Sequence, residues 1–172
     1  IDARHRWSNG QRITAQNYLS SFQRLIDPKT GSPQSDILFT LKNARAIAMG
    51  QKGTETLGVK SLDEETLDFE FEDEDFEFEY RLASPALSPW PNGGFKRSRE
   101  GADLMPTSGP YSIAEWREGQ SLKLKRNPHH PSNHTVQRPD AQAFFIDSDA
   151  TATSLYEAGK LDFLRRVVAS DI

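Results

Sequence analysis

Three histidines and one aspartate in the second half of the chain, His129, His130, His134 and Asp140, have side chains of the types that bind zinc. A zinc ion held by such ligands, with one coordination position open, would activate a water molecule. A metal-dependent hydrolase is therefore the enzyme hypothesis for this sequence. The histidines, however, lie in a loop rich in Pro, Ser and Asn, whereas a metal site needs ligands on a fixed scaffold. A solvated polar loop is the simpler interpretation.

The stretch GTETLGVK, Gly53–Lys60, approaches the pattern of a phosphate-binding loop. In that pattern a lysine directly follows the second glycine, whereas here Val59 separates Gly58 from Lys60. A loop that enters a strand explains the stretch better. The chain also has no G-x-S-x-G, no H-E-x-x-H and no cysteine nucleophile, so its motifs do not indicate an enzyme, and we expect no cofactor.

Eight carboxylates and no basic residue lie between Asp68 and Glu79, with four phenylalanines among them. A divalent-cation site usually mixes carboxylates with carbonyls from a tight, glycine-containing loop, and this run has no glycine. Because Asp68, Glu70 and Glu72 alternate with apolar residues, they are expected on the solvated face of a strand.

The bulk composition excludes several classes of protein. The 172 residues carry a formal net charge of −4, and the basic residues are scattered rather than clustered, so we expect no nucleic-acid partner. The absence of cysteine excludes disulfides and thiolate metal sites. No apolar run has the length of a membrane span, and the first residues do not form a signal peptide.

Helical spacing is clearest at 13–28, where apolar residues recur about every 3.6 positions after Thr14, a candidate cap. Asp27 and Pro28 end this helix. A second helical region is predicted at 35–49, with Ile37, Leu41, Ala44 and Ala48 on one face, and it ends at Gly50.

Alternating residues predict two hairpins. The first covers 58–72 and turns at Asp63–Glu65, and the second covers 109–128 and turns at Glu118-Gly119. After the first hairpin the period is expected to change near Asp73–Asp75, to a short helix whose buried face is Phe76, Tyr80 and Ala83. Trp7 and Trp116 are expected to pack in the core or between domains rather than to stack on a ligand.

The last described pattern, at 141–166, reads as a strand, a helix from Asp149 to Ala158, a terminating Gly159 and a return strand at Leu161–Leu164, which together form a βαβ-type unit. The Pro-rich stretch Ser88–Gly94 is a candidate domain crossing.

Several segments together resemble one family, the extracytoplasmic solute-binding proteins of peptide and nickel ABC importers, and most closely the oligopeptide-binding branch. The matching segments are WSNGQRITAQNYLSSFQRLIDPKTGSP, LKNARAIAMGQKGTETLGVKSLDEETLDFEFE, SPALSPW, TSGPYSIAEWREGQSLKLKRNP and YEAGKLDF. The resemblance covers nearly the whole chain, while the chain covers a minority of a complete family member.

This resemblance implies an α+β chain, part of a periplasmic-binding-protein type II fold. Residues 1–91 are expected to form most of a peripheral domain, and residues 92–172 part of the first ligand-binding lobe. The second lobe is missing from this arrangement, so a complete cleft is not expected. The function that the resemblance implies is non-covalent capture of an oligopeptide and its delivery to a membrane permease, in the periplasm or another extracytoplasmic location.

The resemblance also places ligand contacts after DPKTGSP and after AGKLD. The corresponding residues here are Ser32, Gln34, Phe163, Leu164, Arg165 and Arg166. In an open α/β sheet a ligand lies beyond the carboxyl ends of the strands, a rule that points to Asp147, Ser148 and the same second segment. Peptide-binding relatives tend to have an aromatic residue where Gln34 stands and polar residues in place of Arg165 and Arg166. Two guanidinium groups would favour a carboxylate-bearing ligand, although they would equally suit an ordinary surface.

Two alternatives stay open at this stage. The chain could be a stand-alone protein-interaction module derived from this fold, and open sheet edges could form a homodimer. Ligand identity is also open, since nickel chelates, murein peptides and sugars occur in the broad family.

Overall fold

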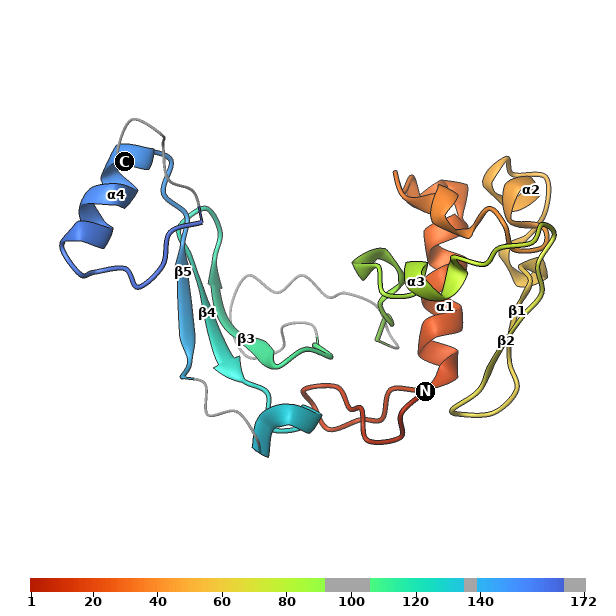
Figure 1. Ribbon diagram of the computed structural model, residues 1–172, viewed down its shortest axis with the longest axis horizontal. Coiled ribbons are helices and arrows are strands. Elements are labelled where there is room, and N and C mark those ends of the chain that lie inside the picture. Colours follow the sequence, from red (N-terminus) through yellow and green to blue (C-terminus); the bar gives the residue numbers. More distant parts are fainter. Residues whose placement is uncertain (92–105, 135–138, 166–172) are drawn as a thin grey trace.

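The computed structural model describes residues 1–91, 106–134 and 139–165 (Figure 1). The first long element is α1, Ala15–Ile26, and it begins where the sequence predicts. Thr14 is its N-cap residue, and the Asn17 side chain reaches back to it, because Asn17 Oδ1 accepts a hydrogen bond from the Thr14 backbone N–H at 3.0 Å. Its apolar face buries Phe22 and Ile26, and Asp27 ends the helix before Pro28.

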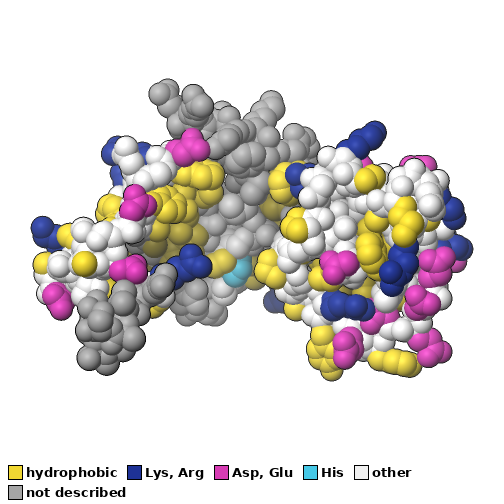
Figure 2. Space-filling model, turned by 90° about the horizontal axis from the view of Figure 1, so that it is seen from above, with side chains coloured by type: hydrophobic (Ala, Val, Ile, Leu, Met, Phe, Trp, Pro, Cys, Tyr) yellow, Lys and Arg dark blue, Asp and Glu magenta, His cyan; other side chains and the backbone are white. Residues whose placement is uncertain are grey.

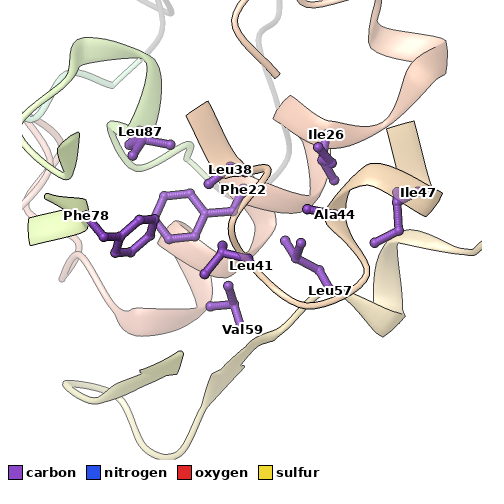
Figure 3. Close-up of a cluster of buried hydrophobic side chains, with 10 residues drawn as sticks. All are labelled: Phe22, Ile26, Leu38, Leu41, Ala44, Ile47, Leu57, Val59, Phe78 and Leu87. Carbon is purple, nitrogen blue, oxygen red and sulfur yellow. The ribbon is translucent and has the colours of Figure 1, made fainter. Parts of the chain in front are cut away.

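One apolar core organises the N-terminal part of the chain (Figure 3). α1 contributes two of the side chains, and the others come from segments that wrap around it. The buried members are Phe22, Ile26, Leu38, Leu41, Ala44, Ile47, Leu57, Val59, Phe78 and Leu87. Burying this many large aliphatic and aromatic groups is the main stabilising contribution here, at about 1.5–3 kcal/mol for each fully buried large side chain.

The second helical region is not continuous, which corrects the prediction for 35–49. A 3₁₀ turn, η2, covers Ser35–Leu38, and a one-turn helix, α2, covers Ala44–Ala48. Between them Asn43 has a left-handed backbone, φ 64°, and Leu41 forms an isolated β-bridge with Phe71. This isolated bridge to a distant residue takes the backbone of Leu41 out of the helix, while its side chain stays in the core.

The first predicted hairpin is confirmed as β1, Val59–Ser61, paired antiparallel with β2, Leu67–Phe69. It follows the short turns η1, Pro28–Thr30, and η3, Thr54–Thr56. Asp68 and Glu70 are exposed, while the side chains that alternate with them face the core. The carboxylates of this strand are therefore on its solvated face, as expected.

The short helix after the acidic run is present, but its predicted buried face is wrong. α3 covers Phe78–Arg81, and the residue that enters the core is Phe78. Its ring meets Phe69 at 5.2 Å and Phe71 at 5.0 Å between centroids, both edge-on. Phe76 and Tyr80 point to solvent instead. A helix of one turn is too short for the spacing of its residues to show which face is buried. The packing of these aromatic rings decides instead which side chain enters the core.

The chain then returns along α1 through η4, Pro85–Leu87. Ser21 Oγ donates a hydrogen bond to the carbonyl of Ser88 at 2.6 Å, and the Arg24 guanidinium lies 4.2 Å from the ring centroid of Trp90. Ser88 and Trp90, in the first part of the predicted domain crossing, thus contact α1. The remainder, beyond residue 91, lies outside the described residues.

The C-terminal part contains a three-stranded antiparallel sheet in the order β3-β4-β5. β3, Tyr111–Arg117, and β4, Ser121–Arg126, form the second predicted hairpin, with a register shift between Ile113 and Glu115. β4 is followed by η5, Pro131–His134, and then by β5, Ala141–Phe144, which pairs with the other edge of β4. α4, Asp149–Glu157, comes last.

The return strand predicted at Leu161–Leu164 is not formed: these residues pair with no described strand. Among the described residues, β5 pairs only with β4. A strand needs a partner, and the closing half of the βαβ-type unit has none here. The described helices also include none long and apolar enough to cross a membrane.

The two parts differ sharply in burial. Every buried hydrophobic residue that the structure describes lies between Trp7 and Leu87, whereas the buried residues at 106–165 are the polar Ser121 and Asn127. Hydrophobic side chains gather instead on the surface of the C-terminal part (Figure 2). A small sheet without an apolar core has little independent stability.

Candidate ligand-binding site

Ser32 and Gln34, the first pair of predicted ligand contacts, lie in the loop after α1. The Asp27 carboxylate accepts a hydrogen bond from the Lys29 backbone N–H at 2.9 Å and so starts η1. Gly31 ends η1 with a left-handed backbone, φ 62°. Ser32 Oγ then accepts from the Gln34 backbone N–H at 3.3 Å, while the Gln34 side chain is exposed and bonds to no other described residue. The loop thus presents an amide to solvent.

Phe163, Leu164 and Arg165, from the second group, follow α4. Ser148 caps this helix by accepting from the Thr151 backbone N–H at 3.3 Å, so Ser148 has a structural task. At the other end Gly159 has φ 67°, and its N–H donates to the Tyr156 carbonyl at 2.9 Å. The chain then leaves the helix without regular structure.

The segment after α4 offers an aromatic ring and a cation to solvent. Phe163 is 80% exposed, and Leu164 is half-buried. Arg165 is exposed and makes no ion pair with a described residue. Arg166 lies outside the described residues. A ring beside a guanidinium group can hold an apolar group and a carboxylate together.

The structure does not bring the two predicted groups together. The loop after α1 belongs to the N-terminal part, and α4 lies at the far end of the C-terminal part (Figure 1). Within the described residues each group therefore contributes to a different surface. A ligand that contacted both would need the parts in a different arrangement or a longer molecule.

The histidine loop holds no metal-binding cluster within the described side chains, since no three His, Asp or Glu residues there are grouped as ligands would be. The His129 ring lies against Gly10, and the His130 ring nitrogen Nδ1 is 2.8 Å from Ser132 Oγ. Asp140 accepts a hydrogen bond from the Arg126 backbone N–H at 3.1 Å. The His134 side chain lies outside the described part.

Large side chains that the sequence did not predict to be exposed occur on and near β3, β5 and α4. They are between about two-fifths and four-fifths exposed: Trp116, Phe144, Phe145, Tyr156 and Phe163. Of the two tryptophans expected to pack in the core or between domains, Trp7 is buried at 3% exposure and Trp116 is 39% exposed. The sequence did carry one signal for these exposed side chains, because 141–146, AQAFFI, is apolar on both faces of its strand.

A groove of about 550 Å³ lies in the N-terminal part, between α1, β2 and η4. Tyr18, Phe22, Phe69 and Leu87 form its apolar floor. Partial burial raises the pKa of Tyr18 above its ordinary value. The polar atoms at the rim are already engaged, since the Glu65 carboxylate pairs with Arg12 at 2.6 Å. The groove therefore has volume, but few groups that would orient a ligand.

A family model described as "Bacterial extracellular solute-binding proteins, family 5 Middle" matches residues 3–172. The chain belongs to this family. It is 30% identical over 162 residues to the probable deoxycholate-binding periplasmic protein YgiS of Escherichia coli, covering 91% of this chain and 30% of that protein. It is 29% identical over 163 residues to the periplasmic oligopeptide-binding protein OppA of Salmonella typhimurium, with the same coverage.

Solved structures agree with this assignment. OppA of Burkholderia pseudomallei superposes with a TM-score of 0.88 at 27% identity, over 98% of this chain and 34% of that one. The murein tripeptide binding protein MppA of Escherichia coli gives 0.87 at 26% identity, over 94% and 33%. The fold is therefore part of a periplasmic-binding-protein type II architecture with mixed helices and strands, as the sequence predicts. The chain spans about 30% of the length of the curated relatives it matches.

Proposed function

We propose that this family 5 chain takes part in the capture of peptides for an ABC importer, and that the segment Phe163–Arg165 contacts the ligand. The observation that carries this is the exposed ring of Phe163 two residues from an Arg165 guanidinium group that has no ion-pair partner among the described residues. A general peptide binder must neutralise the ligand's terminal carboxylate while reading its side chains loosely. Arg165 would pair with the terminal carboxylate, and the Phe163 ring would contact apolar side chains without selecting among them.

The large exposed side chains around β5 and α4 support the same proposal. A hydrophobic surface next to a cation can hold the body of a peptide and its carboxyl terminus at once. Ligand binding by this chain is expected to be weak, because only one side of a ligand meets these residues. Relatives named as oligopeptide-binding proteins support peptide as the ligand class.

The experiment is an NMR titration of the 15N-labelled chain with trialanine and with its C-terminal amide. The free acid should shift the resonances of Phe163–Arg165, and the amide should shift them several-fold less. Arg165→Ala should remove the difference between the two peptides, whereas Lys160→Ala, a matched change at an exposed cation nearby, should preserve it. Equal shifts with both peptides would exclude the carboxylate contact.

A bile acid is a second candidate, because one relative is named as a probable deoxycholate-binding protein. A steroid carboxylate also combines a large apolar body with one anionic group, so it suits the same exposed ring and guanidinium group. Deoxycholate below its micellar concentration is the probe, in the same titration. Larger shifts with deoxycholate than with trialanine would make the bile acid the preferred ligand.

We further infer that delivery to a membrane permease takes place outside the cytoplasm, in keeping with relatives named as periplasmic. We also infer a second copy of the chain as a partner, because β5 has one edge without a paired strand among the described residues and no charged or proline residue within it. Sedimentation over a range of concentrations tests this. Gln142→Pro should abolish a dimer that forms through β5, and an unchanged dimer would exclude that edge.

A further inference from the structure

Three aromatic side chains are exposed on one short segment of the N-terminal part, although aromatic rings usually pack inside a protein. Phe76 is 85% exposed, Tyr80 74% and Phe71 40%. On the face of the N-terminal part that Figure 2 shows, acidic, basic and hydrophobic side chains are interspersed. We call these three rings and the carboxylates between them, Glu72, Asp73, Glu74, Glu77 and Glu79, the acidic aromatic face. An exposed group of large rings typically marks an interaction site.

The acidic aromatic face is held in place by buried contacts beneath it. The Phe71 ring packs edge-on against the buried Phe78, 5.0 Å between centroids. The Asp75 carboxylate, 5% exposed, accepts a hydrogen bond from Thr40 Oγ1 at 2.6 Å and forms an ion pair with Arg81. Contacts at Phe71 and Asp75 thus hold the backbone of this segment, which lowers the entropy lost when a partner binds.

The charge of the acidic aromatic face selects its partner. All five carboxylates are exposed, and none makes an ion pair with a described residue. Such a surface repels phosphate groups, so it fits neither nucleic acid nor anionic lipid. It attracts lysine and arginine, whose cations pair with carboxylates and also stack on aromatic rings. A hollow of about 380 Å³, lined by 71–76, can receive one such side chain.

We propose that the acidic aromatic face is a docking surface for a basic segment of another protein. Arginine or lysine side chains of the partner stack on Phe76 and Tyr80 while their charges meet Glu72 and Glu74. Aromatic and arginine residues dominate the energetics of protein interfaces, and unlike charges set partner choice and the association rate. The proposal is separate from ligand capture, because the acidic aromatic face lies in the N-terminal part and Phe163–Arg165 follows α4.

The probe is a fluorescein-labelled octapeptide of alternating arginine and leucine, with a glutamate–leucine octapeptide for comparison. Fluorescence anisotropy at physiological ionic strength should show saturable binding of the basic peptide and none of the acidic one. The double variant F76A/Y80A should weaken binding about tenfold, since each exposed cation–aromatic contact contributes a few-fold. Both rings are exposed, so this variant should keep the circular dichroism spectrum of the unaltered chain.

Matched variants separate this surface from general electrostatic attraction. E72Q/E74Q and D36N/E55Q each remove two exposed carboxylates from the N-terminal part, but only the first pair belongs to the acidic aromatic face. The first variant should weaken binding severalfold and the second should change it little. Tyr156→Ala removes a half-exposed ring elsewhere and should have no effect. Equal weakening by the two carboxylate variants, or unchanged binding by F76A/Y80A, would overturn the proposal.

Discussion

Ser8 and Thr107 are joined by two hydrogen bonds although 99 positions separate them in the sequence. The Ser8 backbone N–H donates to the Thr107 carbonyl at 2.8 Å, and the Thr107 backbone N–H donates to Ser8 Oγ at 3.1 Å. Nearby, the His129 ring lies against Gly10. The first residues of the chain therefore contact the C-terminal part directly, although the sequence assigns them to the peripheral domain.

Replacing Ser8 by alanine should loosen this connection. Thr107 N–H would lose its acceptor in a partly buried place, which typically costs about 1 kcal/mol. Hydrogen exchange should show faster exchange at Thr107 and an unchanged rate within α1. Ser154→Ala, at an exposed position of α4, is the control and should alter neither. Unchanged protection of Thr107 would show that its N–H does not depend on the Ser8 side chain.

Burial predicts that two leucines contribute very differently to the free energy of unfolding. Leu41 is completely buried, so Leu41→Ala should lower the free energy of unfolding by about 2–5 kcal/mol. Leu62 is 64% exposed in the turn region of the first hairpin, and Leu62→Ala should change stability by less than about 0.5 kcal/mol. Urea denaturation followed by circular dichroism measures both. Comparable losses would mean that Leu41 does not belong to the stabilising core.

Local patterns were sufficient to predict α1 and both hairpins. In α1 the apolar spacing and the capping residue Thr14 agree, and in the first hairpin Leu67 and Phe69 alternate with acidic residues about a polar turn. These elements are specified by contacts within a few residues of each other. The family resemblance, carried by segments spread over the chain, likewise led to the correct fold.

Features that depend on distant contacts could not be predicted. The break at Asn43 follows from a β-bridge between Leu41 and Phe71, thirty positions away. The choice of Phe78 over Phe76 as the buried ring follows from its contact with Phe69. The candidate site depends even more on distant geometry. Nothing in the sequence around Gln34 or Phe163 indicates that the loop after α1 and the segment after α4 belong to different parts of the molecule (Figure 1).

Gly58 explains the sequence that resembled a phosphate-binding loop. Its N–H donates to the Lys42 carbonyl at 2.9 Å, and its carbonyl accepts from the Glu70 N–H at 2.8 Å. A Cβ at this position would lie 2.3 Å from the Glu70 carbonyl oxygen and 2.9 Å from the Lys42 backbone nitrogen. The glycine is therefore required for the close approach of three backbone segments rather than for a ligand.

Gly58→Ala should consequently destabilise the N-terminal part by about 1–3 kcal/mol or more, because backbone atoms must move to admit the methyl group. Gly109→Ala is the matched control, since no heavy atom lies within 4 Å of the corresponding Cβ and its backbone is not left-handed. Thermal unfolding followed by circular dichroism distinguishes them. Equal melting temperatures for the two variants would contradict the tight packing around Gly58.

Acid should weaken the second hairpin through Glu115, which lies opposite Lys123 in the register of β3 and β4. Hydrogen bonds from Lys123, at 2.6 Å, and from Arg117, at 2.5 Å, hold the pKa of Glu115 below its ordinary value. A carboxyl group with a lowered folded-state pKa stabilises the fold above its unfolded pKa, about 4.3, and this contribution is lost as the pH falls through the folded-state pKa.

Glu115→Gln should therefore be less stable than the unaltered chain at pH 7, and the difference should shrink as the pH falls below about 4. The measurement is the free energy of urea unfolding at several pH values, followed by tryptophan fluorescence, to which Trp116 on the same strand contributes. Glu157→Gln is the control, because Glu157 is exposed on α4 and makes no ion pair with a described residue. Glu115 has two partners, Lys123 and Arg117, so Lys123→Gln alone should reproduce only part of the loss of stability.

A difference in stability between Glu115→Gln and the unaltered chain that stayed constant from pH 7 to pH 3 would show that the ion pairs across β3 and β4 do not contribute to stability.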